Sequence, residues 1–295
     1  MTIAAGFVHS EGVMLCSDTQ FEAGASKTYG TKLGFFNCPG GNIAYAFAGN
    51  ASFAMSAIQK CEEKLKSTPA GDTICQIEKT LDREYRRVVY GHFDHTFDWT
   101  LPYVFLIALQ RPGRRCSLFA IEQTAMRSVP DSECIGVGKD FATYLVKPDW
   151  PSALASMTEY EALLLAASTL ARVKAHVSGC GGTSQFIMMR NDGGLGSMSH
   201  SFSGIEERIN SYDASTQTLL SDIANVDLGD SDFEKRLDLF SQNVRYLRQM
   251  MRDPMQIARR EFDAAIERKN TIPPTARLVP ESTTHDLQPP PASQE

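Results

Sequence analysis

The second residue of the chain combines two groups that could cut an amide bond together. Thr2 follows the initiator methionine, which is usually removed when a small residue such as threonine comes next. We therefore expect a mature chain that begins with a threonine hydroxyl and a free α-amine. An unperturbed α-amine titrates near pH ~8 and can accept a proton near neutrality. It could thus activate the hydroxyl of its own residue, which is a weak nucleophile alone.

Three stretches near Thr2 carry a more specific pattern: GVMLCSDTQ at residues 12–20, TKL at 31–33 and AFAGNA at 46–51. They resemble the β-type subunits of proteasomes and their simpler bacterial relatives, the proteasome-like N-terminal-nucleophile hydrolases. The spacing from Thr2 to Asp18 agrees with the family pattern without a gap. Lys32 matches the family lysine if the loop before it is shorter, and Ala48-Gly49 matches the Ala-Gly ahead of the first helix. The resemblance spans roughly residues 2–194.

The resemblance implies a role for three residues beside Thr2. Lys32 would place a cation beside the hydroxyl and lower the pKa of the neighbouring amine. Asp18 would hold Lys32 charged and in place. The backbone N–H of Gly49, next to a helix N-terminus, would donate to the developing oxyanion. The alternative is a purely structural ion pair between Asp18 and Lys32 and a plain tight turn at Gly49.

The resemblance also implies a primary specificity pocket, shaped by Phe21, Phe47 and Ala51. Phe47 would fill part of this pocket. Its presence does not define which substrate side chain the pocket prefers. The six histidines show no metal-ligand spacing, and the seven cysteines form no CxxC pair or disulfide pattern. We therefore expect no metal site and no cofactor.

A second group of family residues is absent. Proteasome β-subunits place a serine in a Gly-Ser-Gly run, and an aspartate three residues before the serine of a Ser-Gly-Gly run. Here Val137 replaces the first serine, Val177 the aspartate and Cys180 the second serine. Aligning Ser178 with that serine instead puts Ala175 at the aspartate position. Because these groups orient the threonine amine, their loss puts the efficiency of turnover in question.

Hydrophobic periodicity predicts strands and helices in alternating groups. Strands gathered in runs, with helices in pairs, favour an α+β fold with antiparallel sheets. The resemblance implies a four-layer α/β/β/α sandwich of the N-terminal-nucleophile hydrolase type with a C-terminal helical extension. Expected strands are 2–8, 12–17, 32–36, 42–47, 103–109, 116–121 and 185–189, with a loop from Phe21 to Gly30; expected helices are 51–66, 71–90, 139–146 and 159–177.

Three parts are expected along the chain. Residues 2–200 would form the proteasome-like domain, and residues 201–270 a helical C-terminal extension. In that extension Asp253-Pro254 is typical of a helix start. Residues 271–295, rich in proline, are expected to be a disordered tail.

Charge and hydropathy limit the partners. A formal net charge of −6 disfavours nucleic acid and anionic membranes, which need a concentrated basic face. No apolar run is long enough for a membrane span, and the N-terminus lacks the basic start of a secretory signal, so a cytoplasmic location is expected. The resemblance implies polypeptide substrates, a homo-oligomeric ring and an ATP-dependent unfoldase as a candidate partner.

Three functional hypotheses follow. The leading one is a threonine-type endopeptidase with Thr2 as nucleophile and its α-amine as base. The second is a catalytically weakened or inactive ring-forming scaffold subunit, which Val137 and Val177 favour. The third is a small-molecule amidase of the wider N-terminal-nucleophile group. An asparagine oxyanion donor and an arginine-rich cleft would favour that third hypothesis, and neither can be assigned in the sequence.

Overall fold

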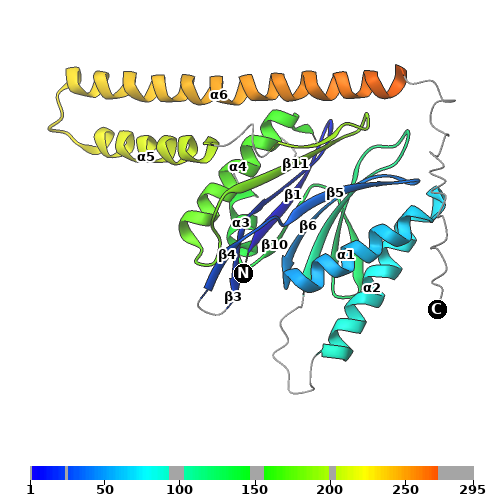
Figure 1. The fold of residues 1–295 in the computed structure, drawn as a ribbon. Coiled ribbons are helices and arrows are strands. Elements are labelled where there is room, and N and C mark those ends of the chain that lie inside the picture. Colours follow the sequence, from blue (N-terminus) through cyan, green and yellow to red (C-terminus); the bar gives the residue numbers. More distant parts are fainter. Residues whose placement is uncertain (1, 24–25, 93–102, 147–155, 199–203, 272–295) are drawn as a thin grey trace, which may run out of the picture.

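The computed structural model describes residues 2–23, 26–92, 103–146, 156–198 and 204–271. Two β-sheets lie face to face in the body of the molecule, and helices cover the outer face of each sheet (Figure 1). This is the expected α/β/β/α sandwich, and the fold class is confirmed. The predicted disordered tail lies outside the described residues from 272 onward.

Each sheet is antiparallel and has five strands. The first sheet has the order β10-β1-β2-β11-β12, and the second has the order β5-β6-β7-β8-β9. The first sheet contains β1 (Ile3–His9), β2 (Gly12–Asp18), β10 (Ser132–Gly136), β11 (Ser184–Arg190) and β12 (Leu195–Ser197). The second contains β5 (Leu33–Cys38), β6 (Gly41–Gly49), β7 (Tyr103–Gln110), β8 (Ser117–Glu122) and β9 (Ala125–Val129).

The helices divide between the two outer faces. On the second sheet lie α1 (Ala51–Lys66) and α2 (Thr73–His92), after a short 3-10 turn, η1 (Ala70–Asp72); on the first sheet lie α3 (Lys139–Val146) and α4 (Glu159–His176). Two further helices follow, α5 (Ile205–Ala224) and α6 (Asp230–Thr271). No helix in the part of the chain that the structure describes is long and apolar enough to cross a membrane.

Strand alternation separates the interior into three apolar layers. In β1, for example, Ala5 packs toward the helices while Ala4 packs between the sheets. The layer between the sheets is rich in small side chains, including Ala44, Ala46 and Ala48 of β6. Small side chains on facing strands allow two sheets to approach closely.

Three local expectations were wrong. Residues 21–30, expected as a loop, contain the hairpin β3 (Gln20–Ala23) and β4 (Ser26–Tyr29). Every residue of β4 is exposed, so the hairpin has no apolar alternation to detect. Strands β9 and β10 were also not anticipated. Finally, α6 continues through Pro254 instead of beginning there, because a proline removes only one hydrogen bond and helix formers flank it.

The buried His9 at the end of β1 gives a pH prediction. Its Nδ1 accepts a hydrogen bond from the Glu11 N–H at 3.3 Å, and its Nε2 has no hydrogen-bond partner among the described residues. Burial, and then the charge of Arg190, lower the pKa of His9 from 6.5 to about 4. Between these values the unfolded chain binds a proton that the folded chain does not, so stability should rise with pH.

The test compares urea unfolding of the natural chain and a His9→Asn variant between pH 4 and pH 8. Asparagine keeps an acceptor and cannot titrate. The two proteins differ in their free energy of unfolding, and this difference should change by up to about 3 kcal/mol between about pH 4 and 6.5. Above about pH 6.5 the difference should stay constant. A difference that does not vary with pH would show that the imidazole titrates alike in both states.

Candidate active site

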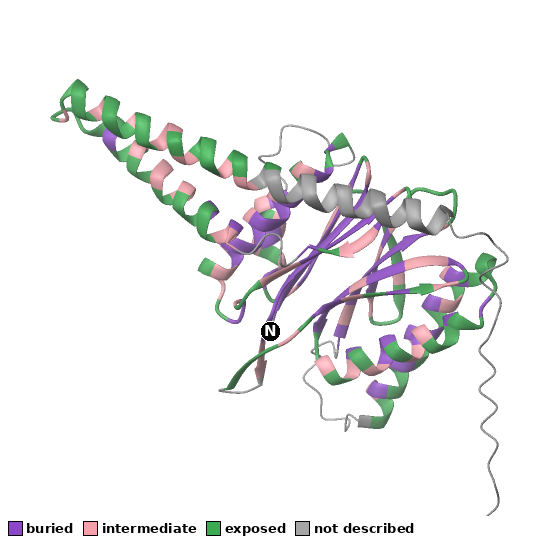
Figure 2. Ribbon diagram, turned by 45° about the horizontal axis from the view of Figure 1, so that its top comes forward, coloured by how far each residue is buried: buried purple, intermediate pink, exposed green. Residues whose placement is uncertain are grey.

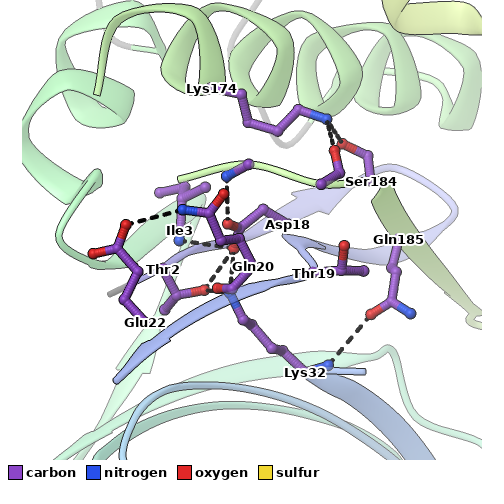
Figure 3. Close-up of polar contacts among 12 residues, drawn as sticks. Thr2, Ile3, Asp18, Thr19, Gln20, Glu22, Lys32, Lys174, Ser184 and Gln185 are labelled. Carbon is purple, nitrogen blue, oxygen red and sulfur yellow. Dashed lines mark hydrogen bonds and ion pairs between the residues drawn. The ribbon is translucent and has the colours of Figure 1, made fainter. Parts of the chain in front are cut away.

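Thr2 and Lys32, two of the residues that the sequence singled out, meet at the carboxylate of Asp18 (Figure 3). Asp18 is the last residue of β2, and Thr2 directly precedes β1, the neighbouring strand. Its Oδ1 accepts hydrogen bonds from the Thr2 hydroxyl at 2.6 Å and from the Ile3 N–H at 3.1 Å. The same oxygen accepts the Lys32 ammonium at 2.6 Å. Thr2, Asp18 and Lys32 are therefore brought together as the spacing predicted.

Lys32 reaches this carboxylate from the opposite sheet. It lies directly before β5, and its side chain is 0% exposed, as is that of Asp18. The ammonium donates to the Thr2 hydroxyl and to the backbone carbonyl of Gln20, and lies 4.7 Å from the centre of the Phe21 ring. Burial lowers the pKa of Lys32 below 10.5, and the charge of Asp18 opposes that change. The lysine is thus easier to deprotonate than one in water.

Backbone groups that the sequence did not reveal complete the site. The other oxygen of Asp18, Oδ2, accepts the Gly181 N–H at 2.9 Å. The Gly138 N–H donates to the Thr2 carbonyl at 3.3 Å. Gly136 has φ +96°, and a Cβ there would lie 2.3 Å from the same carbonyl oxygen. Only the glycines themselves could have indicated these contacts, because backbone groups occur in every residue.

Of the residues predicted to shape a specificity pocket, Phe21 and Phe47 contact Lys32. The Phe47 N–H donates to the Lys32 carbonyl at 3.1 Å, which joins β6 to the lysine. The rings of Phe21 and Phe47 stack with centroids 6.2 Å apart. Phe47 is almost fully buried, whereas Phe21 is half-buried and closer to the surface. Ala51 is the first residue of α1 and is half-buried.

Gly49 ends β6 and precedes the helix, as expected. Its φ of +102° is a conformation that side-chain-bearing residues rarely adopt, so the turn requires glycine. Asn50 caps α1 by accepting the Phe53 N–H at 3.2 Å. The positive end of the α1 dipole therefore begins next to Gly49.

The three residues that depart from the expected pattern, Val137, Val177 and Cys180, supply no ionised side chain. Val137, between Gly136 and Gly138, is 47% exposed. Val177 is half-buried and packs on the apolar layer between the first sheet and its helices. Burial, and then the charge of Asp18, raise the pKa of Cys180 to about 12, so it is a neutral thiol at neutral pH. Within the described ranges, no three His, Cys, Asp or Glu side chains gather into a metal-binding cluster.

The layers and the strand order define a class: the chain has the α+β sandwich of the proteasome-like N-terminal-nucleophile fold. Solved structures of Anbu are similar to it. Anbu from Hyphomicrobium sp. strain MC1 has a TM-score of 0.60 at 17% identity, covering 77% of this chain and 100% of that one. Anbu from Yersinia bercovieri, described as an ancestral beta-subunit, has a TM-score of 0.60 at 16% identity, covering 76% and 98%.

A third Anbu structure, titled a helical assembly of the Anbu complex from Pseudomonas aeruginosa, has a TM-score of 0.60 at 17% identity and covers 75% of this chain and 96% of that one. No protein-family model and no curated protein sequence matches the chain. At such identities these likenesses establish the fold alone.

The buried Asp18–Lys32 pair gives a stability prediction. Asp18→Ala should cost about 3–5 kcal/mol in the free energy of unfolding, because it leaves the Lys32 ammonium buried without its counter-charge. Adding Lys32→Met should recover part of that loss. The measurement is urea unfolding at pH 7 and one fixed protein concentration.

The matched control is the exposed pair of Lys66 and Glu62 on α1, whose charged atoms are 3.1 Å apart. Glu62→Ala should cost no more than about 0.5 kcal/mol, because solvent screens the pair. Equal costs for Asp18→Ala and Glu62→Ala would contradict the buried environment described here.

Proposed function

We propose that the chain is a proteasome-like threonine-type endopeptidase, with Thr2 as nucleophile and its α-amine, freed by removal of Met1, as base. The observation that carries the proposal is the double engagement of the Thr2 hydroxyl, which donates to Asp18 and accepts from Lys32. A purely structural Asp18–Lys32 pair needs no hydroxyl bonded to both of its partners. Here the hydroxyl is held against a buried cation, the arrangement that favours an alkoxide-like oxygen.

The proposed reaction has two halves. The Thr2 Oγ1 attacks the carbonyl carbon of the scissile peptide bond while its proton passes to the α-amine. The backbone N–H of Gly49 stabilises the resulting oxyanion. As the C–N bond breaks, the departing amine takes the proton and leaves an ester on Thr2. Water then hydrolyses the ester with the same amine as base, which restores the hydroxyl.

Lys32 and Asp18 stabilise the negative charge that develops on the Thr2 oxygen during the reaction. A protonated Lys32 stabilises negative charge on Oγ1, and Asp18 keeps the ammonium directed at that oxygen. Burial lowers the pKa of Lys32 below 10.5. The rate of peptide hydrolysis should therefore fall as the pH rises through this lowered pKa, because the ammonium then loses its proton. In this proposal Phe21, Phe47 and Ala51 border the pocket for the substrate side chain that precedes the cut.

A second candidate is a ring-forming scaffold subunit that has lost activity. It is favoured by the outward side chain of Val137 and the apolar Val177, since neither offers a hydrogen bond to an amine at Thr2. Self-assembly belongs to both candidates and is supported by the helical assembly named for the P. aeruginosa Anbu structure. Polypeptide substrates, a cytoplasmic location and an ATP-dependent unfoldase belong to the peptidase proposal.

Intact mass and covalent labelling test the proposal together. The purified chain should lack the mass of Met1. A peptide epoxyketone, which reacts with a hydroxyl and a free amine on one residue, should then add one equivalent to the N-terminal peptide. Thr2→Ser should still be labelled. Thr2→Ala, which also permits removal of Met1, should lose both labelling and peptide hydrolysis.

The possible results separate the candidates. A retained Met1 blocks the amine and rejects the peptidase. An assembled protein that lacks Met1, yet neither reacts with the probe nor hydrolyses peptides, supports the scaffold subunit. Labelling that persists in Thr2→Ala would show that another residue is the nucleophile.

A further inference from the structure

The hairpin of α5 and α6 stands apart from the sandwich at one end. The two helices lie side by side, and the turn between them projects well beyond the sheets (Figure 1). Along this projecting part the surface is largely exposed (Figure 2). We call residues 219–239 the hairpin tip. The helices are joined there by the ion pair of Asp222 with Arg236 and nearer the body by the rings of Tyr212 and Phe240.

The hairpin tip exposes apolar side chains that a solvated helix does not need. Ile223 is 63% exposed and Val226 is 94% exposed. Six of the twelve large hydrophobic side chains that are exposed among the described residues lie on this hairpin: Leu220, Ile223, Val226, Leu239, Val244 and Tyr246. A concentration of exposed apolar side chains on one hairpin is typical of an interaction surface.

Acidic side chains surround this apolar tip. Asp227, Asp230, Glu234 and Asp238 are all exposed, and none has a cationic partner among the residues that the structure describes. The tip therefore presents apolar anchors within a negatively charged rim.

The opposite end of the hairpin borders an apolar groove, which we call the basal groove. It has a volume of about 600 Å³ and lies between α4 and the two helices of the hairpin, with the end of α3 at its side. Its lining is mainly apolar and includes Leu145, Leu164, Ile209, Tyr212, Val244 and Leu247.

Basic and acidic side chains both line the basal groove, the exposed Glu161 among them. Arg172 is already paired with Asp213, at 2.9 Å. Arg248 also lines the groove and is exposed, and Arg245 and Arg252 follow the same helical spacing along α6. None of these three α6 arginines has an acidic partner within the described part of the chain. The basal groove thus has apolar walls, and the arginines along its α6 side complement the acidic hairpin tip.

We propose that the hairpin tip of one copy docks into the basal groove of a second copy of this chain. Ile223, Val226 and their neighbours would fill the groove, while the tip carboxylates meet the α6 arginines. Apolar anchors in a pocket supply most of the affinity of such contacts, and complementary charge supplies orientation. Because two different surfaces meet, the contact is heterologous and can build rings or helical filaments. It rests on the self-assembly proposed above and is independent of peptidase activity.

The first test uses matched charge insertions in the full chain. Ile223→Glu in the tip and Val244→Glu in the groove should each weaken self-association about tenfold or more, measured by sedimentation velocity. Tyr90→Glu on α2, whose native side chain is 76% exposed, should leave it unchanged. Circular dichroism checks that all three variants are folded. Unchanged association in both hairpin variants, or a monomeric natural chain at every concentration, would overturn the proposal.

Charge reversal makes the test specific. Glu234→Lys with Asp238→Lys, and Arg245→Glu with Arg248→Glu, should each impair association alone. A mixture of the two double variants should regain it, because one copy then offers a positive tip to a negative groove. Failure of the mixture to associate more tightly than either variant alone would contradict direct tip–groove contact.

Photo-cross-linking locates the contact. A benzophenone amino acid in place of Val226, in mixed 15N-labelled and unlabelled chains, should yield cross-links between copies to residues 160–172 or 244–248. Cross-links only within one copy, or to other surfaces, would reject the proposal. Epoxyketone labelling of the same samples tests the peptidase proposal separately from the docking proposal. Cross-linking without labelling would reject the peptidase proposal and still support docking of the tip into the groove.

Discussion

The carboxylate of Asp18 bonds to three parts of the chain that are far apart in the sequence. Its two oxygens accept donors from the start of β1, from the lysine ahead of β5 and from the loop between α4 and β11. A buried carboxylate and a buried ammonium are costly unless further hydrogen bonds satisfy them. Each donor therefore helps to stabilise an arrangement that none could stabilise alone, and the position of the Thr2 hydroxyl depends on all of them.

Much of this arrangement could be predicted from the sequence. The turn at His9–Gly12 and the apolar runs on either side predict a hairpin, and antiparallel pairing then returns the end of β2 to the start of β1. Asp18 must consequently lie near Thr2. The helix after Asn50 was equally predictable, because a cap residue precedes a clear apolar stripe. Side-chain type carries the information in both cases.

The remaining parts had no such signal. The N–H of Gly181 and the carbonyl of Gln20 are backbone groups, whose partners depend on how distant segments pack. The hairpin of β3 and β4 lacks buried positions on β4, so no periodicity marks it. The valines at 137 and 177 leave two positions without the polar side chains of the expected pattern. They gave no hint that Gly138 would hold the Thr2 backbone instead.

The alanines of β6 have a consequence for how this site tolerates change. Thr2 and Asp18 lie at one sheet, whereas Lys32, Phe47 and Gly49 lie at the other, so the gap between the sheets sets the distance between the proposed nucleophile and these residues. Ala44, Ala46 and Ala48 help to define that gap. A larger side chain there would have to push the two layers slightly apart, which typically costs about 1–3 kcal/mol. The same separation would move the Lys32 ammonium away from the Thr2 hydroxyl, so these alanines help to set the geometry on which the proposed chemistry depends.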